Sequence, residues 1–72
     1  MKGRIIMKIR VNGKETDIDN GMTILSFLQS KGINPSTVVI EYNYEIPERR
    51  KWGSIFLKDN DNIEVIKFMG GG

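Results

Sequence analysis

The sequence contains no cysteine and no histidine, and these two absences exclude whole classes of function. Without cysteine, the 72-residue chain has neither disulfides nor thiolate metal ligands, although a domain this small has only a marginal hydrophobic core. Without histidine, it lacks the commonest general base and the commonest metal ligand. We therefore expect no catalytic side chain and no metal site, which excludes most hydrolytic, transferase and zinc chemistry.

The composition also lacks alanine, a strong charge of one sign and any long hydrophobic run. Hydrophobic residues make up 39% of the chain and include eleven isoleucines and four valines, a bias that favours strands. The net charge of +2 is too small and too mixed to predict nucleic-acid binding. No hydrophobic run approaches the roughly 20 residues that span a bilayer, and no secretory stretch follows the start. We expect a cytoplasmic protein without nucleic-acid or membrane partners.

The hydrophobic pattern predicts strands at both ends of the chain. Every second residue from Ile5 to Val11 is apolar, which is typical of a half-buried strand. Asn12-Gly13 then favours a tight hairpin turn, because both residues tolerate positive φ. In chain order, strands are predicted over Ile5–Val11, about Glu15–Ile18, Thr37–Asn43 and Ile63–Phe68, with Ile55–Leu57 as a short strand or turn.

One helix is predicted, from Ile24 to Lys31, with Thr23 as its N-cap and Gly32 just past its end. A single helix between two hairpin-like halves must cover one face of a mixed sheet. The fold class is therefore α+β, a β-grasp with four to five strands. We read residues 1–72 as one domain, with residues 1–6 as a possible N-terminal extension and residues 69–72 as a flexible C-terminal tail.

The three glycines that end the chain are its most informative feature. Gly70, Gly71 and Gly72 have no side chain to hold by packing, so this backbone fits a narrow channel in a partner enzyme. A terminal carboxylate becomes a good acyl donor once it is adenylated, and a partner would have to supply the ATP and Mg²⁺. The alternative is a frayed end without function.

Hydrophobic residues beside the tail form a second candidate site. Ile66 lies opposite to Ile63 and Val65 by strict alternation, and with Phe68 and Met69 it would form a docking patch if exposed. The alternative is a strand covered on both faces. Weaker candidates each have a simpler structural explanation, as a charged loop, a hydrogen-bonded turn or core packing: Glu48–Lys51, Asp59 with Asp61 and Glu64, and Trp52 with Tyr44.

Several segments resemble the sulfur carrier family of thiamine biosynthesis, the ThiS family. The resemblance covers Met7 to Gly72. Tyr44 departs from the family pattern, which usually has glycine there, and Asn60 stands where glycine is common. The segments that carry the resemblance are Met7–Gly13, the helix opened by Thr23, Glu41–Asn43 with Glu45-Ile46, Leu57–Val65, and Phe68–Gly72.

The resemblance implies a ubiquitin-like β-grasp that acts as a co-substrate and not as an enzyme. An activating enzyme of the ubiquitin-activating type would adenylate the carboxylate of Gly72 with ATP. A sulfur donor, such as a cysteine desulfurase system, would convert it to a thiocarboxylate, and thiazole synthase would take the sulfur. Gly71 and Gly72 match the family's functional glycine pair, and no cofactor would stay bound.

Two other functions fit the same pattern. The sister carrier of molybdopterin synthesis shares the fold and the terminal glycine pair, and it uses its thiocarboxylate while inserted in a large catalytic subunit. The second alternative function is that of a ubiquitin-like protein modifier or a plain binding module. The modifier predicts isopeptide links from Gly72 to target lysines, whereas the binding module predicts that Gly71 and Gly72 are dispensable.

Overall fold

Four strands and one α-helix build most of residues 5–68, the part of the chain that the computed structural model describes. Two short 3-10 helices complete it. The elements are β1 (Ile6–Val11), β2 (Lys14–Asp19), α1 (Ile24–Ser30), η1 (Pro35–Thr37), β3 (Val38–Tyr42), η2 (Arg49–Ser54) and β4 (Asn62–Lys67). β1 thus begins at Ile6, the last residue of the segment read as an extension.

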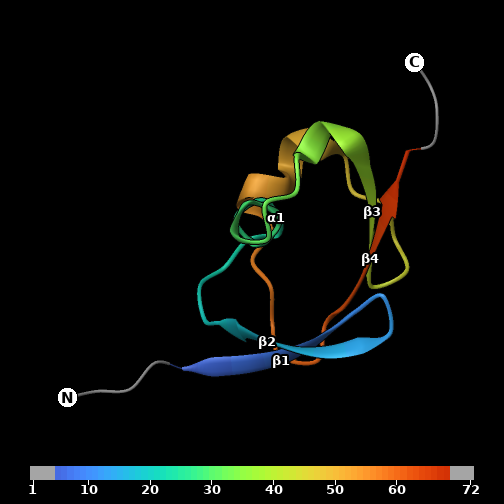
Figure 1. The fold of residues 1–72 in the computed structure, drawn as a ribbon. Helices are drawn as coiled ribbons and strands as arrows, with labels where there is room; N and C mark the ends of the chain where they lie inside the picture. The colour runs from blue at the N-terminus through green and yellow to red at the C-terminus, as the bar shows by residue number, and fades with distance from the viewer. Residues whose placement is uncertain (1–4, 69–72) are drawn as a thin grey trace.

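The strands form a mixed sheet in the order β2-β1-β4-β3, which confirms the predicted fold class. β1 and β2 form an antiparallel hairpin, β3 and β4 a second antiparallel pair, and β1 runs parallel to β4. The parallel pairing is short, joining Arg10 to Asn62 and Val11 to Ile63. Figure 1 shows the consequence, because β1 and β2 lie along the bottom while β3 and β4 rise steeply at the right, with α1 in the angle between them.

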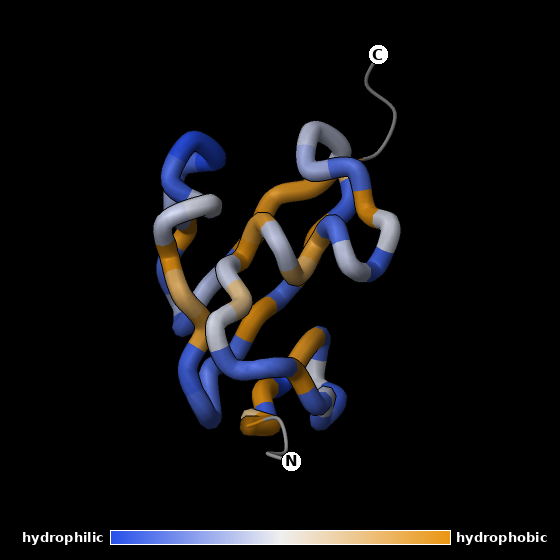
Figure 2. Tube along the Cα trace, turned by 90° about the vertical axis from the view of Figure 1, so that its left-hand side faces the viewer, coloured by the Kyte–Doolittle hydropathy of each residue, from blue (hydrophilic) through white to orange (hydrophobic). Residues whose placement is uncertain are grey.

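The core fills this angle between the helix and the concave face of the sheet. Figure 2 shows hydrophobic and hydrophilic segments alternating along the chain, which is how each strand supplies only one face to the core. The buried hydrophobic residues come from every strand, from α1, from η2 and from the segment before β4: Ile9, Ile18, Ile24, Phe27, Leu28, Val38, Ile40, Trp52, Leu57 and Ile63. Val65 packs against this cluster, as predicted from its alternation with Ile63.

The predicted helix signals are confirmed. The Thr23 hydroxyl accepts from the Ser26 N–H over 3.0 Å, and the Ser26 hydroxyl accepts from the Thr23 N–H over 2.8 Å. This reciprocal pair satisfies two backbone donors that a helix start leaves open. Gly32, just past the helix, has φ of 72°, the left-handed conformation in which glycine is favoured.

The segment after β3 departs from the prediction of a single helix. It contains η2, whose Trp52 is buried in the core, and the Trp52 indole N–H donates to the Pro47 carbonyl over 3.1 Å. Arg49 lies over the Trp52 ring at 5.2 Å and donates to the carbonyls of Pro35 and Val38. Phe56 makes one isolated bridge to Thr23 and belongs to no strand of the sheet.

A tight turn follows β3, and its central residues Asn43 and Tyr44 both have positive φ, of 49° and 72°. Tyr42 and Glu45 close it with hydrogen bonds in both directions. Left-handed backbone is costly for a residue with a Cβ atom, and glycine is the usual second residue of such turns. The Tyr44 side chain is 81% exposed, so packing does not offset this cost.

Tyr44→Gly should therefore stabilise the domain by about 1 kcal/mol, because glycine adopts the left-handed conformation without strain. Thermal or urea unfolding measures the change. Tyr44→Ala is the matched control, since it removes the same exposed ring and keeps the Cβ atom. An equal gain in both variants would show that the ring, and not the backbone, carries the cost.

Candidate functional site

The end of β4 carries the part of the predicted site that the structure describes. Ile66 and Phe68 are 48% and 54% exposed, so the condition for a docking patch, exposure, is met. The Phe68 N–H donates to the Thr37 carbonyl over 3.0 Å, which extends the pairing with the β3 side past the end of the strand. Met69, Gly70, Gly71 and Gly72 lie outside the described residues.

The hairpin turn between β1 and β2 holds β4 in place. Asn12 donates its N–H to the Ile63 carbonyl over 2.9 Å, and its side-chain oxygen accepts from the Val65 N–H over 2.7 Å. The parallel backbone pairing of β1 and β4 ends at Val11 and Ile63, and the Asn12 side chain provides the next hydrogen bond to β4. Because β4 leads to the C-terminal residues, this contact couples the hairpin to the direction in which the chain leaves the sheet.

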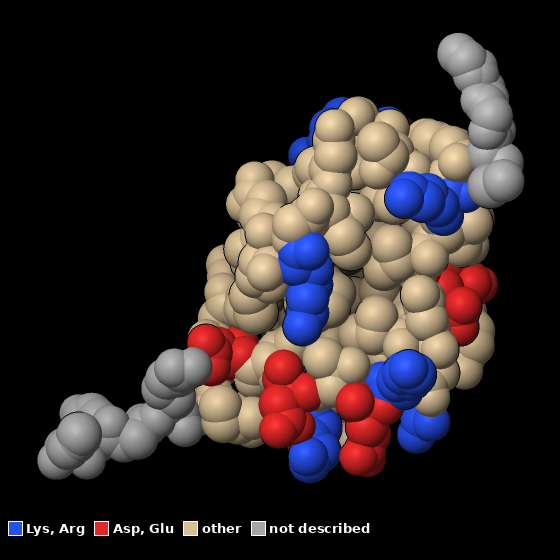
Figure 3. All heavy atoms as spheres, viewed as in Figure 1, with Lys and Arg blue, Asp and Glu red and all other residues tan. Residues whose placement is uncertain are grey.

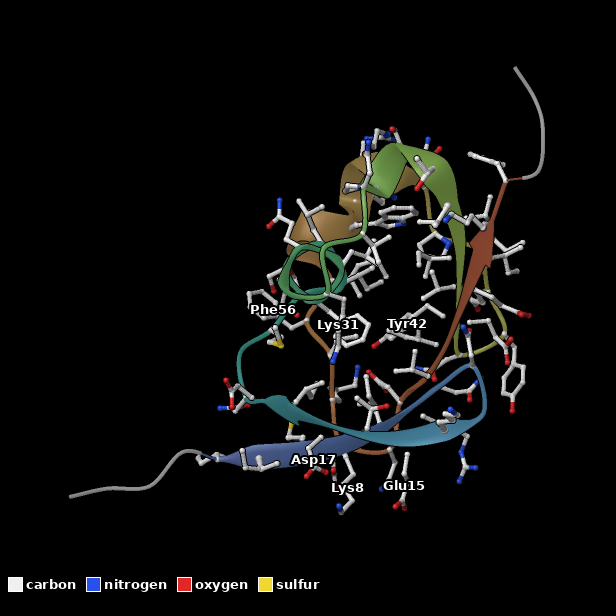
Figure 4. All side chains as sticks on the ribbon, in the orientation of Figure 1. Lys8, Glu15, Asp17, Lys31, Tyr42 and Phe56 are labelled. Atoms are coloured by element: carbon white, nitrogen blue, oxygen red, sulfur yellow. The ribbon has the colours of Figure 1, made fainter. Side chains whose placement is uncertain are left out.

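A buried carboxylate fixes the turn that precedes β4. Asp61 is only 5% exposed, and its side chain accepts from the Tyr42 hydroxyl over 2.6 Å, the Lys58 N–H over 2.7 Å and the Asn43 amide over 3.1 Å. Figure 4 shows Tyr42 pointing into the space between the sheet and the helix. The neighbouring Asn60 has φ of 73°, which fits a position where glycine is common in the family pattern. The cluster ties the β3 end to the β4 start.

The same contacts shift two pKa values in opposite directions. Burial by itself would raise the pKa of Asp61, but hydrogen bonds from Tyr42, Asn43 and the Lys58 N–H, with the Lys58 charge, hold it below its ordinary value of 3.8. Burial, followed by the hydrogen bond and the charge of Asp61, raises the pKa of Tyr42 to about 12. The ionised carboxylate and the neutral phenol therefore stabilise each other.

The free energy of unfolding should accordingly fall at both ends of the pH range. The contribution of Asp61 to the free energy of unfolding is fully present above pH 3.8, its ordinary pKa. This contribution is lost as the pH falls through the lowered pKa of the folded state. The contribution of Tyr42 to the free energy of unfolding is fully present below pH 10.0, its ordinary pKa. This contribution is lost as the pH rises through the raised pKa of about 12. Urea unfolding across the pH range tests this, and Tyr42→Phe should flatten the alkaline limb; an unchanged alkaline limb in that variant would contradict the assignment.

Several of the weaker candidates have structural roles. Arg49 is held by backbone carbonyls, Arg50 pairs with Glu48 over 2.8 Å, and Asp59 accepts from the Lys8 N–H over 2.8 Å. Within residues 5–68, no group of three acidic, histidine or cysteine side chains is arranged to hold a metal ion. No helix in this range has the length and hydrophobicity to cross a membrane.

The surface carries several depressions. One of about 420 Å³ lies beside the end of β4, and Lys67 is the single charged side chain among its described lining residues. An amine without an acid or a second base beside it makes no acid–base pair. The sequence placed Asp61 in a hydrogen-bonded turn, but its contacts with Tyr42 and Asn43 were not predicted, because these residues are 19 and 18 positions away and only the β3–β4 register brings them to Asp61.

Comparison with known proteins identifies the family of this chain. The family model described as the ThiS family matches residues 9–72. The sulfur carrier protein ThiS of Bacillus subtilis is 35% identical over 66 residues, covering 89% of this chain and 98% of its own length. A thiazole synthase of Magnetococcus marinus is 36% identical over 66 residues, or 92% of this chain, yet this chain spans only 20% of that protein.

Solved structures show the same relationship. The crystal structure of the thiamine biosynthesis protein ThiS from Geobacter metallireducens matches 92% of this chain and 100% of its own, with a TM-score of 0.79 and 32% identity. The match extends over the four-stranded sheet and the helix, which is the β-grasp of that family. On this fold, on the family match to residues 9–72 and on the Bacillus relative, the chain belongs to the ThiS family of sulfur carriers in thiamine biosynthesis.

Proposed function

We propose that this chain carries sulfur on its own C-terminal carboxylate and is a co-substrate without catalytic side chains. A partner enzyme adenylates the carboxylate of Gly72, which displaces pyrophosphate from ATP. Sulfide would displace AMP and leave a thiocarboxylate directly. A persulfide from a cysteine desulfurase system would displace AMP to give an acyl disulfide, and a thiol would then cleave its S–S bond, which releases the thiocarboxylate and forms a disulfide between that thiol and the donor sulfur. ATP and Mg²⁺ belong to the activating partner, and the proposed location is the cytoplasm.

The observation that carries this proposal is a glycine-only end placed three residues beyond a strand of a ThiS-family fold. Gly70 and Gly71 are proposed to thread the active site of the partner, because a backbone without Cβ atoms fits a narrow channel. Ordering such a segment is entropically costly, so the affinity has to come from the folded domain.

The proposed acceptor of the sulfur is thiazole synthase. Two relatives named thiazole synthase, from Magnetococcus marinus and Paramagnetospirillum magneticum, resemble this chain over a segment that spans about a fifth of their length. A carrier-like segment within a synthase supports a functional link between the two. The test adds the thiocarboxylated chain to thiazole synthase or to the large subunit of molybdopterin synthase. Sulfur transfer to the first alone is expected, and transfer to the second alone would overturn the choice of pathway.

Ile66, Phe68 and Met69 are proposed to dock on these partners. Phe68→Ala should weaken binding of the activating enzyme about tenfold, because exposed aromatic residues are frequent anchors of interfaces. The free energy of unfolding should change by less than about 0.5 kcal/mol, since the side chain is already half exposed.

Phe56→Ala is the matched control for this substitution. Phe56 is 57% exposed, close to the value for Phe68, and Figure 4 shows it beside α1, away from β4. Calorimetric titration of each variant against the activating enzyme gives the two affinities. An equal loss of affinity in both variants, or an unfolded Phe68→Ala domain, would contradict the docking patch.

A further inference from the structure

The outer face of the β3–β4 pair combines hydrophobic and acidic residues. Val38 and Ile40 of β3 point into the core, so the alternation places Val39 and Glu41 on the opposite face. The same alternation in β4 places Glu64 and Ile66 there, beside Phe68. This surface, defined by Val39, Glu41, Glu64, Ile66 and Phe68, is called the acidic–apolar face.

The strand register sets the two glutamates directly opposite each other. Glu41 pairs with Glu64, and the next outward-facing pair is Val39 with Ile66. Side chains directly opposite in an antiparallel pair have Cβ atoms about 5 Å apart, and two like charges in this arrangement are destabilising. Among the described residues, neither carboxylate forms an ion pair with a lysine or arginine.

In the β1–β2 hairpin, residues of opposite charge face each other across the strands. Lys8 pairs with Asp17 and bonds it over 2.8 Å, and Arg10 pairs with Glu15. Figure 4 shows Lys8, Asp17 and Glu15 together on the lower side of the hairpin, and Figure 3 shows basic and acidic side chains alternating along this edge. The β1–β2 hairpin thus balances its charges across the strands, whereas the β3–β4 pair does not.

Because like charges that face each other are destabilising, the glutamate pair is unfavourable for the isolated strand pair. The pair lies one outward-facing rung from Ile66, whose side chain is 48% exposed. An arginine or lysine placed over two opposed carboxylates would remove their repulsion and form charge-assisted hydrogen bonds to both. A bound partner could place such a positive charge over Glu41 and Glu64.

We propose that the acidic–apolar face docks on a basic, hydrophobically lined surface of the adenylating enzyme, with an arginine or lysine placed between Glu41 and Glu64. This inference rests on the proposed function. Charge complementarity supports this occupant, because two opposed carboxylates without a basic partner among the described residues favour a surface that presents an arginine or lysine. The hydrophobic residues supply buried area, and the glutamates set the orientation.

The test measures carrier-dependent ATP–pyrophosphate exchange by the adenylating enzyme with the Glu41→Gln/Glu64→Gln variant. The KM for the carrier should rise about tenfold with kcat unchanged, since the glutamates act in docking and not in the reaction. The thermal midpoint of the free variant should equal or exceed that of the wild type, because repulsion is removed. Binding and stability thus move in opposite directions, which a structural role would not produce.

The matched control is Glu15→Gln/Asp17→Asn, which changes the net charge equally but on the hairpin. Its KM should stay within about twofold of the wild type. An unchanged KM for Glu41→Gln/Glu64→Gln, an equal rise in the control, or a lower thermal midpoint would overturn the docking inference. If the wild-type chain supports no exchange at all, the proposed function fails instead.

Discussion

Deleting Gly71 and Gly72 is expected to abolish thiocarboxylate formation while leaving the domain folded. The proposed chemistry occurs on the terminal carboxylate, and a chain ending at Gly70 presents its carboxylate two residues short of the nucleotide. The hydrophobic core is built from residues between Ile9 and Ile63, so the thermal midpoint should not change. Intact mass after incubation with the activating enzyme, ATP and a sulfur source is the readout.

The truncated chain also provides its own control, because it keeps the docking surface. It should compete with the full-length chain for the activating enzyme, with an inhibition constant within about threefold of the full-length KM if docking supplies the affinity. Full activity of the truncated chain would contradict the carrier function and would favour a binding module. Loss of activity without competition would show that the affinity comes from the tail.

Asp61→Ala is expected to have the largest effect on stability among the polar substitutions discussed. The change removes a buried acceptor and leaves the Tyr42 hydroxyl, the Lys58 N–H and the Asn43 amide without it. Buried donors without a partner are costly, and the expected loss is about 3 kcal/mol in the free energy of unfolding. Such a loss is a large fraction of the stability of a small domain.

Asp17→Ala provides the comparison for this substitution. Asp17 lies in β2 and bonds to Lys8, but this bond is exposed, so its removal should cost less than about 1 kcal/mol. Urea unfolding at neutral pH measures both variants. Equal losses would show that the buried cluster has no special role in stability.

The sequence carried enough local signal for most of the fold. The alternation from Met7 to Val11, the Asn12-Gly13 turn and the Thr23 cap depend on residues close in sequence, and each is confirmed. Ile5 lies outside β1 and is 65% exposed, contrary to the prediction. The segment from Pro47 to Ser54 was harder, because its 3-10 helix depends on Trp52 entering the core and on Arg49 reaching carbonyls at residues 35 and 38. Such contacts have no periodic pattern.

The candidate site was accessible from the sequence for a different reason. Its proposed reactive group is the carboxylate of Gly72, which can be named without knowledge of the fold. The exposure of Ile66 and Phe68 depended on which face of β4 is covered, and the structure resolves this alternative in favour of exposure. The opposition of Glu41 and Glu64 was invisible, because it follows from the β3–β4 register over 23 residues of separation.

The most direct test of the carrier function is the intact mass of the full-length chain after incubation with the adenylating enzyme, Mg-ATP and a sulfur source. Replacement of one terminal oxygen by sulfur should raise the mass by the difference between the two atomic masses, and fragmentation should place the change on Gly72. An unchanged mass, in a reaction where the Bacillus subtilis carrier is converted by its own activating enzyme, would contradict the account.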